Sequence, residues 1–114
     1  MFKFLKLDVY NSAKIFYYKM FEISVHLKLN NYMKDQLSRA AFSVPLNIAE
    51  GTGKFSKRDQ RNFFVIARAS LFERIAIIDI LAGDKRINRE DYISIINEAE
   101  GLSRQLYTMI GKLS

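Results

Sequence analysis

Few residues of this 114-residue chain have the types and spacing that catalysis or metal binding requires. The single histidine, His26, follows Glu22 by four residues, whereas a di-metal carboxylate site in a helical bundle uses Glu-x-x-His on two helices. The absence of cysteine excludes disulfides, thiolate metal ligands and cysteine nucleophiles. The segment Gly51-Thr-Gly53-Lys54 lacks the G-x-x-x-x-G-K-[ST] spacing of a phosphate-binding loop. We therefore expect a protein with no catalytic site, no metal and no cofactor.

Five basic residues have a pattern that suits the binding of a polyanion instead. The net charge of +6 and the pI of about 9.7 favour nucleic acid or an acidic protein surface as the partner. At about 100° per residue these five fall on one side of a helix, and Asp59 is the only acid among them. Phe55 and Phe64 flank this basic stripe. Lys and Arg contact phosphates without any required spacing, so a solvated helix face is the alternative interpretation. The basic stripe consists of Lys54, Lys57, Arg58, Arg61 and Arg68.

A second set of polar residues lies beside the apolar positions of the neighbouring helices. If the helices before and after Gly53 are antiparallel, Arg39 comes level with Glu73, and Glu50 comes level with the basic residues after the corner. We expect interhelical pairs that fix the packing, because half-buried charges are usually paired. The alternative is that Asn47 and Glu50 belong to a binding surface. The set consists of Arg39, Asn47, Glu50, Gly51, Ser70 and Glu73.

Apolar residues recur at steps of three and four along the chain, which predicts helices rather than strands. Asn30 and Asn31 mark the end of the first helix, while Ser56 and Asn88 have the type and position of N-caps for the last two. Short connections favour antiparallel neighbours, and hence one all-α domain, residues 1–114, folded as an up-down-up-down four-helix bundle. The expected helices span Asp8–Leu29, Met33–Glu50, Lys57–Ala82 and Arg89–Leu113.

The second expected helix contains a proline and ends in glycines. Pro45 removes one backbone hydrogen bond and crowds the carbonyl of Ala41, which costs about 3 kcal/mol in a regular helix. Because the apolar pattern keeps its phase through Pro45, we predict a kinked helix, with two short helices as the alternative. Gly51 and Gly53 can take positive φ, which suits a helix C-terminus and a chain reversal.

Two helices have more apolar surface than a monomeric bundle needs. The segment Ile75–Leu81 is apolar nearly all round, although each helix of a monomeric bundle should have a solvent face. The first helix has a second apolar stripe beside its heptad seam, made by Tyr10, Tyr17, Phe21 and Val25. We therefore predict a homo-oligomer.

The sequence also gives an expectation of location. The first ten residues contain neither a long apolar core nor a small-residue cleavage site, so we expect no signal peptide. No window approaches the ~18 uncharged apolar residues of a membrane span. Together with the lack of cysteine, these features favour a cytoplasmic protein.

Two strings on either side of the basic corner carry a family resemblance. RAAFSVPLNIAEG (Arg39–Gly51) and ARASLFE (Ala67–Glu73), with Val9-Tyr10 in the first helix, resemble bacterial four-helix-bundle proteins of the 23S rRNA intervening-sequence family. The resemblance spans nearly the whole chain. Ala69 departs from the usual glycine, and the stretch between Leu29 and Gln36 is shorter than typical.

The resemblance implies a ring-shaped homopentamer with no known enzymatic activity. A related branch comprises accessory proteins of diversity-generating retroelements, which are basic pentamers that bind a reverse transcriptase and nucleic acid. Two functional expectations follow. One is an accessory protein that binds RNA or DNA through the basic stripe, and the other is a protein-interaction scaffold with no nucleic-acid role.

Overall fold

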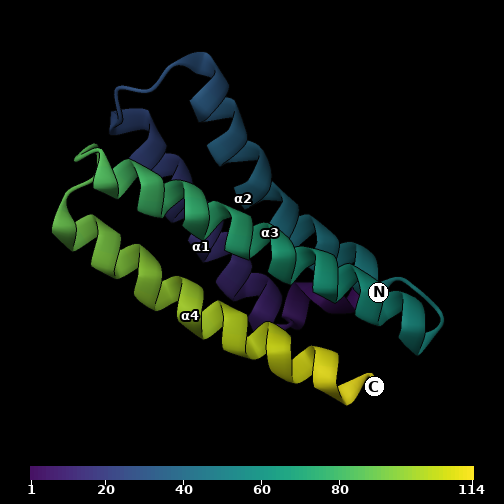
Figure 1. Ribbon diagram of the computed structural model, residues 1–114. Coiled ribbons are helices and arrows are strands. Elements are labelled where there is room, and N and C mark those ends of the chain that lie inside the picture. Colours follow the sequence, from purple (N-terminus) through teal and green to yellow (C-terminus); the bar gives the residue numbers. More distant parts are fainter.

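A computed structural model describes residues 1–114 and contains four long helices and no strand (Figure 1). A short 3-10 helix, η1 (Lys3–Lys6), precedes them. The four helices are α1 (Asp8–His26), α2 (Asn31–Thr52), α3 (Lys57–Gly83) and α4 (Arg89–Lys112). Each helix packs on the next, and α4 returns to α1, so the four close around one core. The whole molecule measures 44 × 23 × 20 Å. The predicted all-α four-helix bundle is confirmed.

The core follows the predicted heptad positions. In α1, Val9, Ala13, Phe16 and Met20 are buried, at the steps of four and three that a heptad seam predicts. The other helices contribute Leu, Ile, Val and Ala at the same spacing to one contiguous cluster. Burying a large apolar side chain of this kind contributes roughly 1.5–3 kcal/mol. The core therefore rests on a pattern that is visible in the sequence.

Three side chains cap the helix starts. Asn30, Ser56 and Asn88 each accept the backbone N–H of the residue three positions later, at 2.8, 3.0 and 2.8 Å. The predicted caps at Ser56 and Asn88 are confirmed. Asn30 was expected to close the first helix and instead begins the second, because α1 ends at His26. Each cap contributes about 1 kcal/mol.

The α2–α3 corner differs from the sequence expectation. No glycine has a positive φ, and Gly53 has φ −85° and ψ −5°. Gly51 is buried inside α2, where a Cβ atom would lie 2.9 Å from Cε1 of Phe64 and 3.0 Å from Cβ of Phe63. Glycine is needed at position 51 for close helix packing and not for left-handed backbone.

Pro45 lies within α2, which is one continuous helix from Asn31 to Thr52. The alternative of two short helices is therefore wrong. The proline is buried, so its apolar ring adds to the helix contacts that offset its missing hydrogen bond. A bend of the helix axis at Pro45 stays a prediction.

The α3–α4 turn contains the one residue with a positive φ, Lys85, at φ 60°. The amide of Arg86 donates to the carbonyl of Leu81, and the amide of Lys85 donates to that of Ala82, each at 3.0 Å. These two bonds make a Schellman motif with lysine where glycine is usual.

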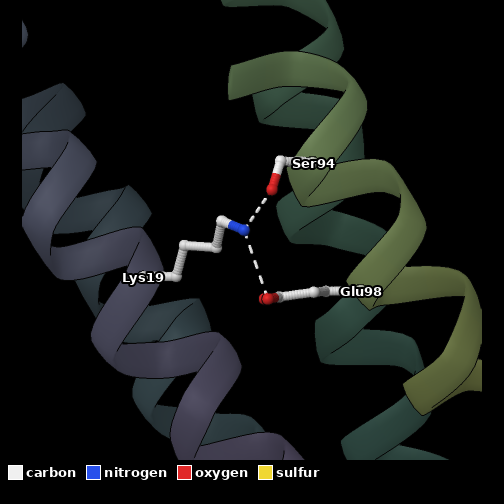
Figure 2. A network of polar contacts seen from close by, with 3 residues as sticks. All are labelled: Lys19, Ser94 and Glu98. Atoms are coloured by element: carbon white, nitrogen blue, oxygen red, sulfur yellow. Dashed lines mark hydrogen bonds and ion pairs between the residues drawn. The ribbon is translucent and has the colours of Figure 1, made fainter. Parts of the chain in front are cut away.

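A polar contact joins the first and last helices. Lys19 of α1 donates to the hydroxyl of Ser94 in α4, and its Nζ atom lies 3.2 Å from Oε1 of Glu98 (Figure 2). The pair is partly shielded from solvent, with 27% and 36% of the two side chains exposed. It links helices that pack on each other less extensively than the other neighbouring pairs do.

Candidate functional site

Three residues of the basic stripe lie exposed on the first turns of α3. Lys57, Arg58 and Arg61 belong to no ion pair. Asp59 is the one acid among them, and its backbone amide donates to the side chain of Ser56, which caps α3. These three cations are therefore free to contact an anion.

The other two stripe residues are placed differently. Lys54 precedes α3, and its ammonium lies 4.9 Å from the ring centroid of Phe63. The guanidinium of Arg68 is half-buried, 4.6 Å from the ring centroid of Phe72 and 5.7 Å from that of Tyr107 in α4. These cation–π contacts help to pack both side chains, and the two residues are still partly exposed to solvent.

The two aromatic residues expected to flank the stripe also differ from each other. Phe64 is 3% exposed and belongs to the core. Phe55 is fully exposed, at 105%. The expectation for Phe64 is therefore wrong, because its position in α3 faces α2, beside Gly51.

The charges of the chain are divided unevenly along the bundle. The half that contains both termini and the α2–α3 corner (residues 1–17, 42–70 and 101–114) has ten Lys and Arg against three acids. The opposite half has eight against nine, so the first half carries a net charge of +7 and the second −1; we call the first the basic half (Figure 1). Its cations are Lys3, Lys6, Lys14, Lys54, Lys57, Arg58, Arg61, Arg68, Arg104 and Lys112.

Two members of the expected polar set meet between α2 and α3. The hydroxyls of Ser43 and Ser70 are 2.6 Å apart, and the side-chain amide of Asn47 donates to the Ser43 carbonyl at 2.8 Å and to its hydroxyl at 3.1 Å. Ser43 is the residue that joins Asn47 to Ser70. This small interhelical network fits the packing role expected of the set, as does buried Gly51.

The charged members of the set are exposed. Arg39 pairs with Asp35 on the same helix, with Nε and Oδ2 3.2 Å apart, so the predicted Arg39–Glu73 pair is wrong. Glu50 and Glu73 form no ion pair. An exposed i, i+4 pair is available to Arg39 within its own helix, and pairing across helices would add little in water.

The sequence interpretation missed a buried charge. Arg74 is 0% exposed, and one terminal nitrogen of its guanidinium donates to the carbonyl of Leu37. Its Nε and other terminal nitrogen have no partner in the protein. Burial lowers the pKa of Arg74 to about 10, against the opposing effect of the Glu73 carboxylate, so the group is charged at neutral pH.

His, Asp and Glu make no group of three or more that could hold a metal ion. The hydroxyl of Tyr92 donates to Asp79 at 2.8 Å, and this bond raises the pKa of Tyr92. None of the helices combines the length with the hydrophobicity that a membrane span requires.

Comparisons with known proteins agree with this architecture. A crystal structure of a protein of unknown function from the S23 ribosomal protein family of Bacteroides thetaiotaomicron is similar, with a TM-score of 0.83 and 25% sequence identity. The similarity covers 90% of this chain and 97% of that one. No curated protein matches this chain. The family model of the 23S rRNA-intervening sequence protein matches residues 5–108, and the chain belongs to that family.

Proposed function

We propose that this protein binds nucleic acid through its basic half. The observation that carries the proposal is the division of charge, with ten cations against three acids at one end and near neutrality at the other. Lys57, Arg58 and Arg61 lie exposed there without acidic partners. Phosphate contacts of this kind release condensed counterions and carry no base information, so binding should be sequence-tolerant and sensitive to salt.

The test is the affinity for a fluorescent 20-nucleotide RNA measured by anisotropy across a range of salt concentrations. The plot of log K against log salt should fall by about 0.7–0.9 for each phosphate contact. Arg58→Glu with Arg61→Glu should weaken binding and flatten that slope by the two lost contacts. The matched control is Lys34→Glu with Arg89→Glu, which makes the same change in net charge at the neutral half, on exposed and unpaired residues.

Two results would contradict the proposal. Wild-type protein that does not bind at low salt has no nucleic-acid function of this kind. Equal losses for the two double variants would mean that net charge alone attracts the RNA, and that the basic half is no site.

We further propose that the chain assembles into a closed ring, a pentamer by family resemblance. Two exposed apolar faces support assembly. One lies on α1 and α2, where Tyr18, Phe21, Phe42 and Leu46 are 49–62% exposed. The other is a stripe along the outer side of α3, formed by Val65, Ala69, Phe72, Ala76 and Ile80.

These two faces differ in composition and lie on different helices. A closed ring uses heterologous contacts, in which one face of each subunit meets a different face of the next. The α1–α2 face is mostly aromatic, and the α3 face alternates large residues with alanine. The rotation of a ring would also repeat the basic half in every subunit, so that weak sites add through avidity.

A protein-interaction scaffold is the second candidate function, and the same apolar faces favour it. A reverse transcriptase as protein partner, a cytoplasmic location and the lack of enzymatic activity stay predictions. Co-purification of the ring with a protein, combined with no RNA affinity at low salt, would favour the scaffold.

A further inference from the structure

An open hollow of about 560 Å³ lies at the end of the basic half. Phe2, Lys3 and Phe4 from the start of the chain form one wall, and the end of α2 and the corner form the other, including Glu50 and Lys54. Aromatic and cationic side chains therefore face the same space.

Phe55 directly follows Lys54, a residue that lines the hollow, on a corner fixed by hydrogen bonds. The carbonyl of Lys54 accepts from the side chain of Gln60 at 2.8 Å, its amide donates to Gly51 at 3.1 Å, and Ser56 caps α3. Both neighbours of Phe55 are thus held by hydrogen bonds, and its ring is fully exposed. Nothing in the monomer's packing uses this ring.

Phe2 is the second exposed ring at this end, 72% exposed. Its ring centroid lies 6.1 Å from that of Phe4, which packs edge-on against Tyr10 of α1 at 4.9 Å. This row of rings holds Phe2 at the rim of the hollow. Lys14 adds a cation 5.1 Å from the Tyr10 ring centroid.

We propose that this end of the molecule is a binding site for single-stranded nucleic acid. The inference rests on the proposed nucleic-acid function and specifies that the ligand is single-stranded rather than double-stranded. Bases stack on the rings of Phe2 and Phe55, and phosphates contact Lys3, Lys54 and Lys57. Every base has a flat π-face, so stacking on aromatic side chains tolerates any sequence.

A single strand fits this surface better than a duplex. In a duplex the faces of the bases are covered by their neighbours, so exposed rings have no surface to stack on. Glu50 is the one acid that lines the hollow, on the same wall as Lys54. Its carboxylate repels phosphates, so we expect a base inside the hollow and phosphates at the ammonium groups of Lys3 and Lys54.

An anionic membrane surface is the competing partner for a surface with phenylalanines and lysines. The concave shape of the site argues for a strand, because a base can enter a hollow that a flat lipid surface bridges. Vesicles therefore form one arm of the test.

The experiment compares 12-nucleotide oligo(U) and oligo(dT), a mixed-sequence 12-base-pair duplex and vesicles with anionic lipid, at one salt concentration. Phe55→Ala should weaken single-strand binding at least about fivefold and leave duplex binding unchanged. Tyr32→Ala is the matched control, an aromatic residue with 72% exposure at the neutral half, and should change neither. The chain has no tryptophan, so Phe55→Trp introduces a unique fluorophore whose emission a stacked base should quench.

The outcomes separate the two proposals. No affinity for any nucleic acid overturns both. A second outcome overturns the stacking site alone. In it, Arg58→Glu with Arg61→Glu weakens the salt-dependent binding, Phe55→Ala leaves the affinity unchanged, and the strand does not quench the emission of Phe55→Trp. Equal affinity for duplex and single strand also overturns the stacking site alone. Binding to vesicles in place of RNA and DNA would assign the surface to lipid.

Discussion

Arg74 carries a charge in the core with a single hydrogen-bond partner in the protein, the carbonyl of Leu37. Replacing a buried charged group by an apolar residue of similar volume often stabilises a protein by 1–4 kcal/mol, as a rough range. We expect Arg74→Met to raise the free energy of unfolding by about this amount at pH 7, measured in urea. Arg104→Met, at an exposed position of α4, should change it by less than about 0.5 kcal/mol.

The stabilisation from Arg74→Met should also depend on pH. Burial holds the folded-state pKa of Arg74 at about 10, below its usual value, so the folded protein binds this proton less tightly than the unfolded chain does. The penalty in the wild type is therefore complete below pH 10 and shrinks as the pH rises above it. A lower stability of the Met variant at pH 7 would show that Arg74 has gained partners, such as ordered water, that satisfy its donors.

Gly51 tests the close contact between α2 and α3. A Cβ at this position would lie 2.9 and 3.0 Å from atoms of Phe64 and Phe63, the second of which is a Cβ atom that cannot move without its helix. Gly51→Ala should lower the free energy of unfolding by about 1–3 kcal/mol through overpacking, despite the better helix propensity of alanine. Gly101→Ala, within α4 and with no atom closer than 4.0 Å, should raise it by about 0.8–1 kcal/mol. Equal effects at the two glycines would mean that the helices separate freely at the corner.

At the scale of whole elements, the helices and two of their three caps could be predicted because their causes are local. Heptad spacing, a serine or asparagine at each N-cap and short connections depend on neighbours in the sequence. The C-terminal end of α1 and the pairing of Arg39 could not be predicted, since they depend on how the helices pack against one another. Arg74 was readable in principle, because it shares the apolar seam of Leu71, Ile78 and Leu81 at steps of three and four.

The α3–α4 turn offers a prediction at the same scale. Lys85 adopts the left-handed conformation that costs a residue with a Cβ about 1–2 kcal/mol. Lys85→Gly should relieve this strain. Glycine also gains entropy in the unfolded chain, which offsets part of the relief, so we expect a net rise of about 0.5–1 kcal/mol in the free energy of unfolding. Lys28→Gly, an exposed lysine with negative φ in the α1–α2 connection, should lower it. A destabilised Lys85→Gly variant would contradict the left-handed assignment.

The distribution of charge becomes visible only at the scale of the whole molecule. The basic stripe was defined along one segment, Lys54 to Arg68, yet cations from η1, α1, the corner, α3 and α4 gather at the same end. They do so because the chain starts at that end and the up-down topology returns it there twice (Figure 1). No local pattern encodes this gathering. The folded bundle therefore extends the candidate surface beyond the stripe. Arg68 contributes less to that surface, because its guanidinium is half-buried against Phe72.

The ring can be tested by damaging one apolar face at a time. Phe21→Glu places a charge on the α1–α2 face, and Ala76→Glu places one on the α3 face. Both positions are exposed, so each subunit should still fold. If the contact is heterologous, each variant alone sediments as a 13.3 kDa monomer, because every contact needs one intact face of each kind. An equimolar mixture should then form a dimer and nothing larger, since the intact α1–α2 face of one variant meets the intact α3 face of the other. Sedimentation equilibrium measures this directly, with wild type as the ring control. Homodimers of either variant, with no change on mixing, would instead show an isologous contact and exclude the ring.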